Sequence, residues 1–349
     1  MKYFQLFSRN TPIIRSCWVV LCLVQFIVLS EGCVSEFGGY ELQDYVSIRD
    51  LKIDPKNSNI LYIATEEGLY KSSNGGDTWE EKLDDGIYAL AISHIYSDTI
   101  YALGHNKLHK SGNAGTSWQT LDISFQVSYY SKVVLVLDPI DNQTLYAGVG
   151  SGLYKSIDGG VNWTNLKPNQ IKSIAIDHRH QGIIYIVGDD GLLKSMDYGV
   201  TWTKTETGLN GTVQVIEMDP LNSETLFCGT TSGLFKSSDG AGTWVATNLN
   251  SSILSVAIDQ ENSKTLYACG QGSLFRSDAN GENWREVNMV PLLTRPNFDI
   301  ISLKIDPDNS DIIYLATSYR GVLKSADAGK SWEFKQVGLP PPPPGGWDI

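Results

Sequence analysis

The sequence predicts an all-β fold, a seven-bladed β-propeller whose blades are four-stranded antiparallel sheets. The first observation is a pattern, Ser-x-Asp/Asn-x-Gly-x-x-Trp, that recurs with some variation at intervals of 39 to 48 residues; such a tandem period is typical of propellers and solenoids. The second is that each repeat holds four short apolar runs separated by turn residues, as in an antiparallel meander. The third is that the second run is apolar on both faces, which requires cover on both sides of the sheet. The seven copies of the pattern begin at Ser72, Ser111, Ser156, Ser195, Ser237, Ser277 and Ser325.

The first repeat shows the elements in order. Residues 46–53 alternate in polarity and predict an inner strand that ends at the turn pair Asp54-Pro55. Residues 61–64 predict a second strand, residues 69–72 a third and residues 80–83 a fourth. Later second strands are predicted at 145–149, 184–188, 226–230, 266–270 and 313–317. A β-helix or solenoid is the structural alternative, and the four-strand repeat argues against it.

The recurring pattern is interpreted as the turn between the third and fourth strands. Its Asp or Asn can accept hydrogen bonds from backbone N–H groups two residues on, Gly supplies a positive φ, and Trp buries a large ring. Two copies deviate, with Ala241 at the Gly position and Ala279 at the Asp position, each beside a displaced Gly or Asp that could compensate. We expect a structural role, without metal or cofactor, for Asn74, Asn113, Asp158, Asp197, Asp239 and Asp327.

The chain ends differ in composition from the repeats. Residues 1–32 combine basic residues, an apolar run from Cys17 to Leu29 and small residues before Cys33, which predicts a signal peptide and export to the periplasm, cell surface or exterior. Two alternatives stay open: a lipid anchor at Cys33, or plain secretion. The expected division is a signal peptide (1–32), an N-terminal segment (33–45), the propeller (46–337) and a Pro-rich tail (338–349).

The charge balance excludes one class of partner. The formal net charge is −12, and no run of basic residues interrupts the acidic background. Such a surface repels the phosphates of nucleic acids, so we expect no nucleic-acid partner.

The seven patterned turns resemble the Asp-box, also called the BNR or sialidase-type repeat, over most of the chain. The layout is most similar to the exported propellers of the photosystem II assembly factor type, and more distantly to xyloglucan-cleaving glycoside hydrolases, sialidases and sortilin. The first resemblance implies a non-enzymatic scaffold that binds a protein or carbohydrate partner. The alternative it implies is a glycoside hydrolase acting on extracellular polysaccharide, yet the Arg-Ile-Pro segment of sialidases is missing here, and so is the second propeller of the xyloglucan enzymes.

Candidate binding residues fall in loops predicted to share one face of the propeller. These are the loops that join second to third strands and those between blades, and we call this side the loop face; the patterned turns lie on the opposite side, the turn face. Loops on a rigid scaffold commonly carry binding residues, and aromatic and arginine side chains make good anchors. The candidates are Phe125, Tyr129, Tyr130, Arg295, Phe298, Tyr319 and Arg320.

Two pairs of neighbouring carboxylates are weak catalytic candidates. Glu66-Glu67 and Asp189-Asp190 occupy equivalent short loops of the first and fourth repeats. Glycoside hydrolysis requires two carboxyl groups roughly 5–9.5 Å apart, whereas adjacent acidic residues in a turn are usually solvated charges. The scaffold reading therefore leads.

Overall fold

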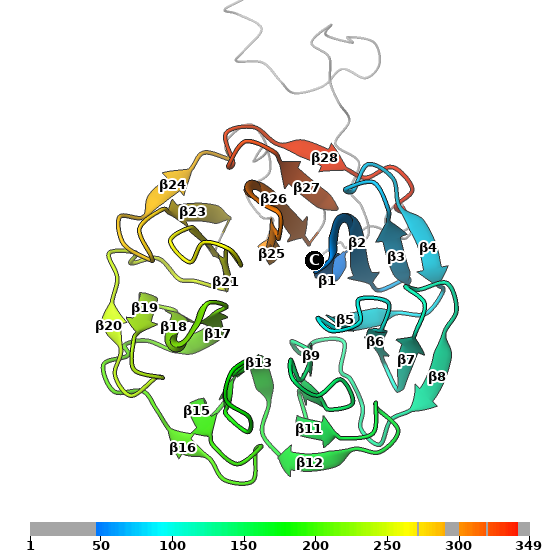
Figure 1. The fold of residues 1–349 in the computed structure, drawn as a ribbon, viewed down its shortest axis with the longest axis horizontal. Coiled ribbons are helices and arrows are strands. Elements are labelled where there is room, and N and C mark those ends of the chain that lie inside the picture. The colour runs from blue at the N-terminus through cyan, green and yellow to red at the C-terminus, as the bar shows by residue number, and fades with distance from the viewer. Residues whose placement is uncertain (1–46, 271, 290–299, 319, 341–349) are drawn as a thin grey trace, which may run out of the picture. The chain divides into compact units, whose positions relative to one another are not determined.

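The computed structural model describes residues 47–270, 272–289, 300–318 and 320–340, all within one compact unit. These residues form seven four-stranded antiparallel sheets, set as blades around a central axis (Figure 1). Each blade takes four consecutive strands of the chain, which confirms the predicted seven-bladed, all-β propeller. Among the described residues there is no helix long and apolar enough to cross a membrane. The predicted signal peptide, Cys33 and residues 341–349 lie outside the described ranges.

The first strand of each blade lies nearest the axis (Figure 1). In five blades its register shifts near the start, and the unpaired residue at the shift is Arg49, Tyr88, Lys172, Gln214 or Ile301. Such β-bulges re-aim side chains at the rims of barrels and beside functional sites. The inner strands are β1 (Ile48–Asp54), β5 (Ile87–Ile92), β9 (Val134–Leu137), β13 (Ile171–Ile176), β17 (Val213–Asp219), β21 (Ser255–Ile258) and β25 (Ile300–Asp306).

The second strands are buried on both faces, as predicted. Within the described residues the apolar core divides into seven clusters, and each cluster joins two neighbouring blades. The blades therefore stabilise one another, and no blade holds a core of its own. The second strands are β2 (Asn57–Thr65), β6 (Ile100–Gly104), β10 (Leu145–Val149), β14 (Ile184–Gly188), β18 (Asn222–Thr230), β22 (Leu266–Gly270) and β26 (Asn309–Thr317).

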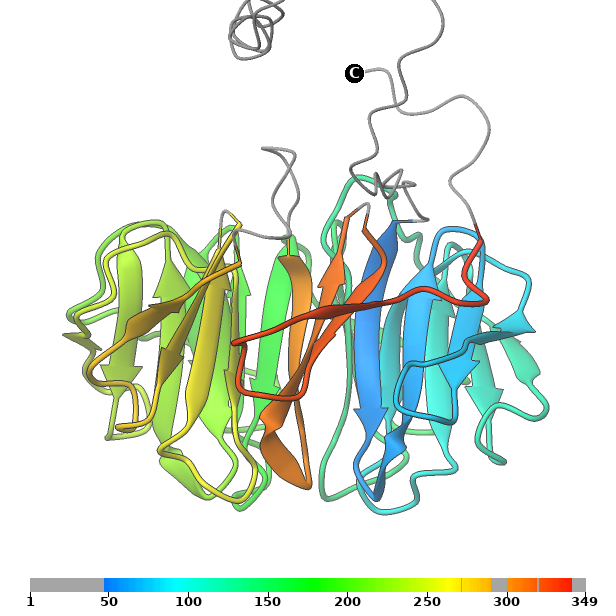
Figure 2. The ribbon, with the colours of Figure 1, turned by 90° about the horizontal axis from the view of Figure 1, so that it is seen from above.

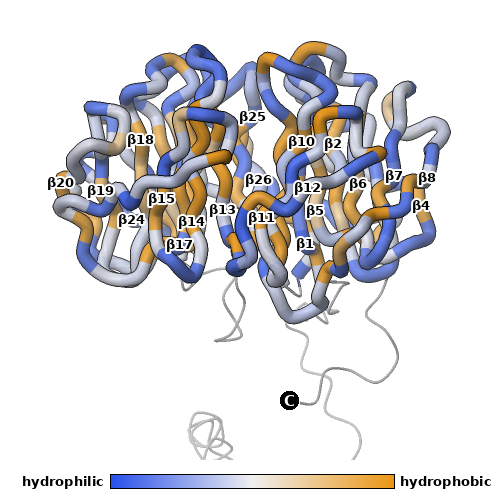
Figure 3. The backbone as a smooth tube through the Cα atoms, turned by 90° about the horizontal axis from the view of Figure 1, so that it is seen from below, coloured by the Kyte–Doolittle hydropathy of each residue, from blue (hydrophilic) through white to orange (hydrophobic). Residues whose placement is uncertain are grey.

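The third and fourth strands form the outer half of each blade, and hydrophobic residues give way to polar ones at the loops (Figure 3). The third strands are β3 (Leu69–Ser72), β7 (Lys107–Ser111), β11 (Gly152–Ser156), β15 (Gly191–Ser195), β19 (Gly233–Ser237), β23 (Ser273–Ser277) and β27 (Val322–Ser325). The fourth strands are β4 (Glu80–Leu83), β8 (Gln119–Asp122), β12 (Thr164–Lys167), β16 (Thr203–Lys204), β20 (Val245–Ala246), β24 (Arg285–Val287) and β28 (Glu333–Lys335).

Side-chain hydrogen bonds close the patterned turn between third and fourth strands. In blade 3, Ser156 Oγ donates to Asp158 Oδ1 (2.8 Å) and accepts from the N–H of Gly160 (2.9 Å). Asp158 Oδ1 also accepts from the N–H of Asn162 (2.9 Å), four residues on and not two as we expected. These bonds to the charged carboxylate lower the pKa of Asp158 to about 2.

The two deviant turns behave differently. Ala241 adopts the positive φ of the Gly position (+67°), and its N–H donates to Ser237 Oγ (2.9 Å), so this turn keeps its geometry. In blade 6, Asp278 does not replace the missing acceptor. It pairs instead with Arg276 (2.7 Å) and Arg285 (3.0 Å).

A contact that the sequence analysis missed ties five of the seven turns to the preceding blade. In blade 4, Lys194 Nζ lies 5.3 Å from the centroid of the Tyr185 ring and donates to the carbonyl of Gly240 in the turn of blade 5 (2.9 Å). Tyr185 Oη donates to the same carbonyl (3.1 Å). We call this arrangement the tyrosine–lysine latch. Corresponding lysine-to-turn bonds come from Lys71, Lys155, Lys236 and Lys324.

The ring closes between blades 7 and 1 by packing. Lys324 Nζ and Tyr314 Oη both donate to the carbonyl of Gly75 (3.1 and 3.3 Å). After β28 the chain crosses onto blade 1, where the N–H of Trp79 donates to Val337 O (2.8 Å) and Leu339 joins the core cluster of Trp79. Each described blade is complete without a strand from elsewhere in the chain.

Candidate functional site

The axis of the propeller opens on the loop face into a hollow of about 490 Å³. Its wall includes Arg49, Tyr88 and Ile301, which are the unpaired residues at the register shifts of blades 1, 2 and 7. The wall also includes Lys132, which precedes β9, and the rim carries Tyr129 and Tyr130. The bulges therefore turn side chains of different blades toward one opening, which we call the channel mouth. In edge view the blades stand side by side around this axis (Figure 2).

An ion pair and a tyrosine order one side of the channel mouth. The Arg49 guanidinium pairs with the Glu66 carboxylate and lies over the Tyr129 ring, 4.5 Å from its centroid. Tyr129 Oη is 2.9 Å from both carboxylate oxygens of Glu66. Burial and then the bond to Glu66 raise the pKa of Tyr129 to about 12, so its hydroxyl stays a neutral donor at physiological pH. Tyr129 is thus held in place by the strand end of blade 1.

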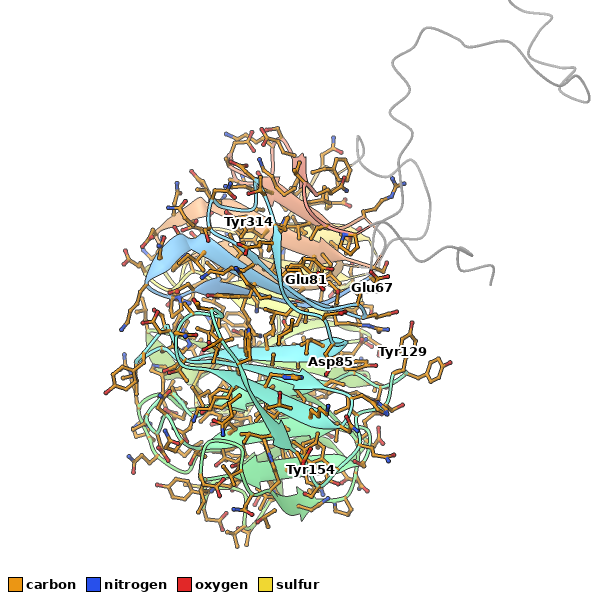
Figure 4. The ribbon with its side chains drawn as sticks, turned by 90° about the vertical axis from the view of Figure 1, so that its right-hand side faces the viewer. Glu67, Glu81, Asp85, Tyr129, Tyr154 and Tyr314 are labelled. Carbon is orange, nitrogen blue, oxygen red and sulfur yellow. The ribbon has the colours of Figure 1, made fainter. Side chains whose placement is uncertain are left out.

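Tyr130 is the most exposed large apolar side chain of the site. Its ring meets that of Tyr129 edge-on (5.1 Å between centroids), and the residue is 94% exposed. In Figure 4, Tyr129 stands out from the loop face, on the same side as Glu67 and Asp85. An anchored tyrosine beside an exposed one offers rigid, amphipathic area to a partner.

The remaining loop-face candidates are placed differently. Phe125 is 5% exposed and stacks on Tyr154 (4.2 Å between centroids) with Trp163 at its edge, so it stabilises blade 3 and offers no surface. Arg320 is also 5% exposed, and its carbonyl accepts from Gln336 Nε2 (2.7 Å). We therefore leave both residues out of the binding surface. Arg295, Phe298 and Tyr319 lie outside the described residues.

Three of the four candidate carboxylates, Glu66, Asp189 and Asp190, have basic or polar partners. Glu66 pairs with Arg49, as above. Asp189 lies 3.3 Å from Lys172 Nζ. The Lys167 ammonium (2.7 Å) and the Asn169 amide (2.7 Å) lower the pKa of Asp190, which disfavours the proton donor that a general acid requires. No group of His, Cys, Asp and Glu among the described residues has the geometry of a metal site.

Arg49, Tyr88 and Lys132 belong to the channel mouth although the sequence analysis did not select them. Arg49 and Tyr88 lie inside alternating strand patterns, and only the bulge that turns them toward the axis makes them part of a site. The signal that could have found them is a polar or aromatic residue at the second position of an inner strand, where a regular register would bury it.

Comparisons with known proteins find solved structures of similar fold but no matching family. No protein-family model matches the sequence, and no curated protein sequence matches it either. Among solved structures the chain is similar to the GH74 xyloglucanase of Xanthomonas campestris, with a TM-score of 0.72 and 17% identity over 85% of this chain and 55% of the enzyme. This chain thus spans about half the length of that enzyme.

Two further solved structures are of comparable size to this chain. YCF48 from Cyanidioschyzon merolae aligns with a TM-score of 0.62 and 18% identity, over 81% of this chain and 95% of YCF48. A structure of YCF48 bound to D1 peptide aligns with a TM-score of 0.62 and 15% identity, over 81% and 92%. At these identities the likeness concerns the propeller fold.

Proposed function

We propose that this chain is an exported, non-enzymatic Asp-box propeller that binds a protein partner through the channel mouth on its loop face. The observation that carries the proposal is the pairing of Tyr129, anchored by Arg49 and Glu66, with the almost fully exposed Tyr130 at the rim of a 490 Å³ hollow. Rigid aromatic residues around an opening are the usual anchors of protein recognition.

The fold comparisons support this reading in one respect. YCF48, which matches this chain along nearly its whole length, has been seen bound to D1 peptide, so a single propeller of this kind can take a peptide. A carbohydrate partner would use the same aromatic surface, and the pull-down described below distinguishes it from a protein partner.

Glycoside hydrolysis is the second candidate function, favoured by the likeness in fold to GH74 enzymes. The charges around the candidate carboxylates weigh against it, because Glu66, Asp189 and Asp190 each face a cation. A hydrolase would release reducing sugar from xyloglucan, and Glu66→Gln would abolish the release.

The test of the scaffold is a pull-down from envelope extract of the native host, with the propeller as bait and mass spectrometry as readout. Tyr129→Ala/Tyr130→Ala removes the proposed anchors. Tyr96→Ala is the matched control, because Tyr96 is 62% exposed but lies beyond β5 on the turn face. A protein recovered by wild type and Tyr96→Ala, but lost from the double variant, supports the proposal. Equal recovery by all three baits overturns it.

Export and lipidation need a separate test. We propose cleavage before Cys33, because basic residues and an apolar run precede it. Intact mass of the protein recovered from the host distinguishes an acylated Cys33, a free Cys33 and an uncleaved chain, and the last result refutes export by this route.

A further inference from the structure

One position of the inner strands is charged in three blades and small or apolar in the other four. This is the residue that pairs with the buried aromatic of the second strand, as Lys52 pairs with Tyr62. The charged members are Lys52, Glu217 and Lys304, in blades 1, 5 and 7. The others are Ala91, Val136, Ala175 and Ala257. This position holds Ala or Val in four blades, yet in the neighbouring blades 7 and 1 it holds the two lysines Lys304 and Lys52.

These charged residues lie on the axis. A cavity of about 330 Å³ is lined by Lys52, Lys304 and Glu217 together with Ala91 and Val136. Since six blades contribute to its wall, the cavity is the end of the central channel on the turn face. Lys132 lines the opposite end, at the channel mouth. The channel therefore has lysines at both ends.

Two of these lysines lack a counter-charge. Lys52 pairs with Asp50 (3.2 Å), and the same carboxylate already accepts the N–H groups of Leu51 and Leu90. Neither the Lys132 nor the Lys304 ammonium makes a hydrogen bond or ion pair with any residue in the described part of the chain. Glu217, which faces Lys304, does not come within salt-bridge distance of it.

The surroundings make these unpaired charges unfavourable. Lys304 is half-buried in the channel wall and Lys132 is exposed at the channel mouth, and desolvation of the ammonium group lowers the pKa of each. Nearby lysines lower them further: Lys172 and Lys304 act on Lys132, and Lys52 acts on Lys304. Burial also raises the pKa of Glu217, which weakens its compensation of the Lys304 charge. Asp50 and Cys269 raise the pKa of both lysines. Both ammonium groups therefore lie near the same stretch of the channel.

We propose that the channel between Lys132 and Lys304 binds a small oxyanion, a phosphate, sulfate or carboxylate group. Ammonium groups bind such anions as point charges with strong, charge-assisted hydrogen bonds. The rest of the molecule carries a net negative charge, so binding depends on these two lysines and not on a general positive surface. The oxyanion is either a free ion or the carboxylate at the end of a partner chain that enters the channel mouth. The second source rests on the proposed function.

The test compares anion-dependent stability of the wild-type protein with that of Lys132→Met/Lys304→Met. Inorganic phosphate is the first probe, against chloride at equal ionic strength. We expect phosphate at ten times its dissociation constant to raise the Tm of the wild type by about 2 °C, and to leave the double variant unchanged. Without anion the double variant should unfold at the same temperature as the wild type or higher, because neither ammonium group that it loses forms an ion pair with a described residue.

The matched control and the source of the anion complete the design. Lys264→Met removes an exposed lysine of a surface turn and should keep the full response. Trialanine with a free carboxylate, compared with trialanine amide, distinguishes a chain end from a free ion. Stabilisation by phosphate alone assigns a free ion, and stabilisation by trialanine but not its amide assigns a chain end. The inference is overturned if the double variant responds like the wild type, or if neither probe stabilises the wild type. Loss of partner binding in the tyrosine variant bears on the proposed function alone.

Discussion

Replacing Lys324 by methionine tests whether the tyrosine–lysine latch stabilises the ring. Lys324 Nζ donates to Gly75 O (3.1 Å) and lies 5.2 Å from the centroid of the Tyr314 ring. A hydrogen bond from a charged group contributes about 1.5–3 kcal/mol, and a cation over an aromatic ring about 0.5–1 kcal/mol. The partial burial that lowers the pKa of Lys324 offsets part of this gain. Methionine keeps the packing over the ring, so we expect a net loss of about 2 kcal/mol.

The assay is urea unfolding followed by tryptophan fluorescence, with Tm as a second readout. A loss of about 2 kcal/mol lowers the Tm by about 4 °C in a large single domain. Lys194→Met is the matched variant, because Lys194 makes the same contact between blades 4 and 5, where the chain also connects the two blades covalently. Lys264→Met again reports the effect of removing an exposed lysine.

Each outcome has a clear meaning. Equal losses in Lys324→Met and Lys194→Met show that the latch contributes as much stability between blades 7 and 1 as between blades 4 and 5. A change below about 0.5 kcal/mol in both variants refutes the energetic role of the latch.

Three further predictions follow from the turns and loops. The folded-state pKa values of Asp158, Asp197, Asp239 and Asp327 are lowered to about 2, so the unfolded chain binds more protons between about pH 2 and 4. Stability from these turns is therefore present above pH 4 and lost on acidification; replacing all four by Asn, the residue at positions 74 and 113, should flatten urea midpoints measured from pH 5 to 2. Ala328 has φ +62° at a position where the turns of blades 1, 3 and 5 have Gly, so Ala328→Gly should gain about 0.5–1 kcal/mol in urea unfolding, and a loss would contradict the strain. Phe125→Ala should lower the free energy of unfolding by about 3–5 kcal/mol and Tyr130→Ala by less than about 0.5 kcal/mol. Similar losses of the two variants in thermal unfolding would contradict the burial of Phe125 and the exposure of Tyr130.

The strands were predictable because their signals are local. Alternation, paired turn residues and a repeated turn located the four strands of blade 1 to within a few residues of β1 to β4. The Gly position that Ala241 fills was predictable for the same reason, since the neighbouring turn residues define it. The behaviour of the turn at Ala279 was not predictable, because Asp278 pairs with Arg276 and Arg285 and does not act as the turn acceptor.

The candidate site was less predictable, since it depends on contacts between blades. Phe125 and Tyr130 look alike in the sequence, yet one fills a gap beside Tyr154 and the other faces solvent. Arg49 becomes a site residue through a bulge, and Lys304 becomes a channel residue through the register of β25 with β26. The bulge has one local signal, the polar or aromatic residue at the second position of an inner strand, and the axial position of Lys304 has none.

The direction of the latch has a consequence for assembly. The five lysine-to-turn bonds of this kind run from one blade to the next in the same rotational sense, so each of these interfaces has a donating blade and an accepting blade. Contacts of this head-to-tail type close into a ring only when the rotation per unit fits the number of units, and otherwise continue into open polymers. A fragment with fewer blades would expose one side of each kind. Partial synthesis or proteolysis of this protein should therefore yield self-associating fragments, whereas neighbouring blades cover these sides in the complete circle.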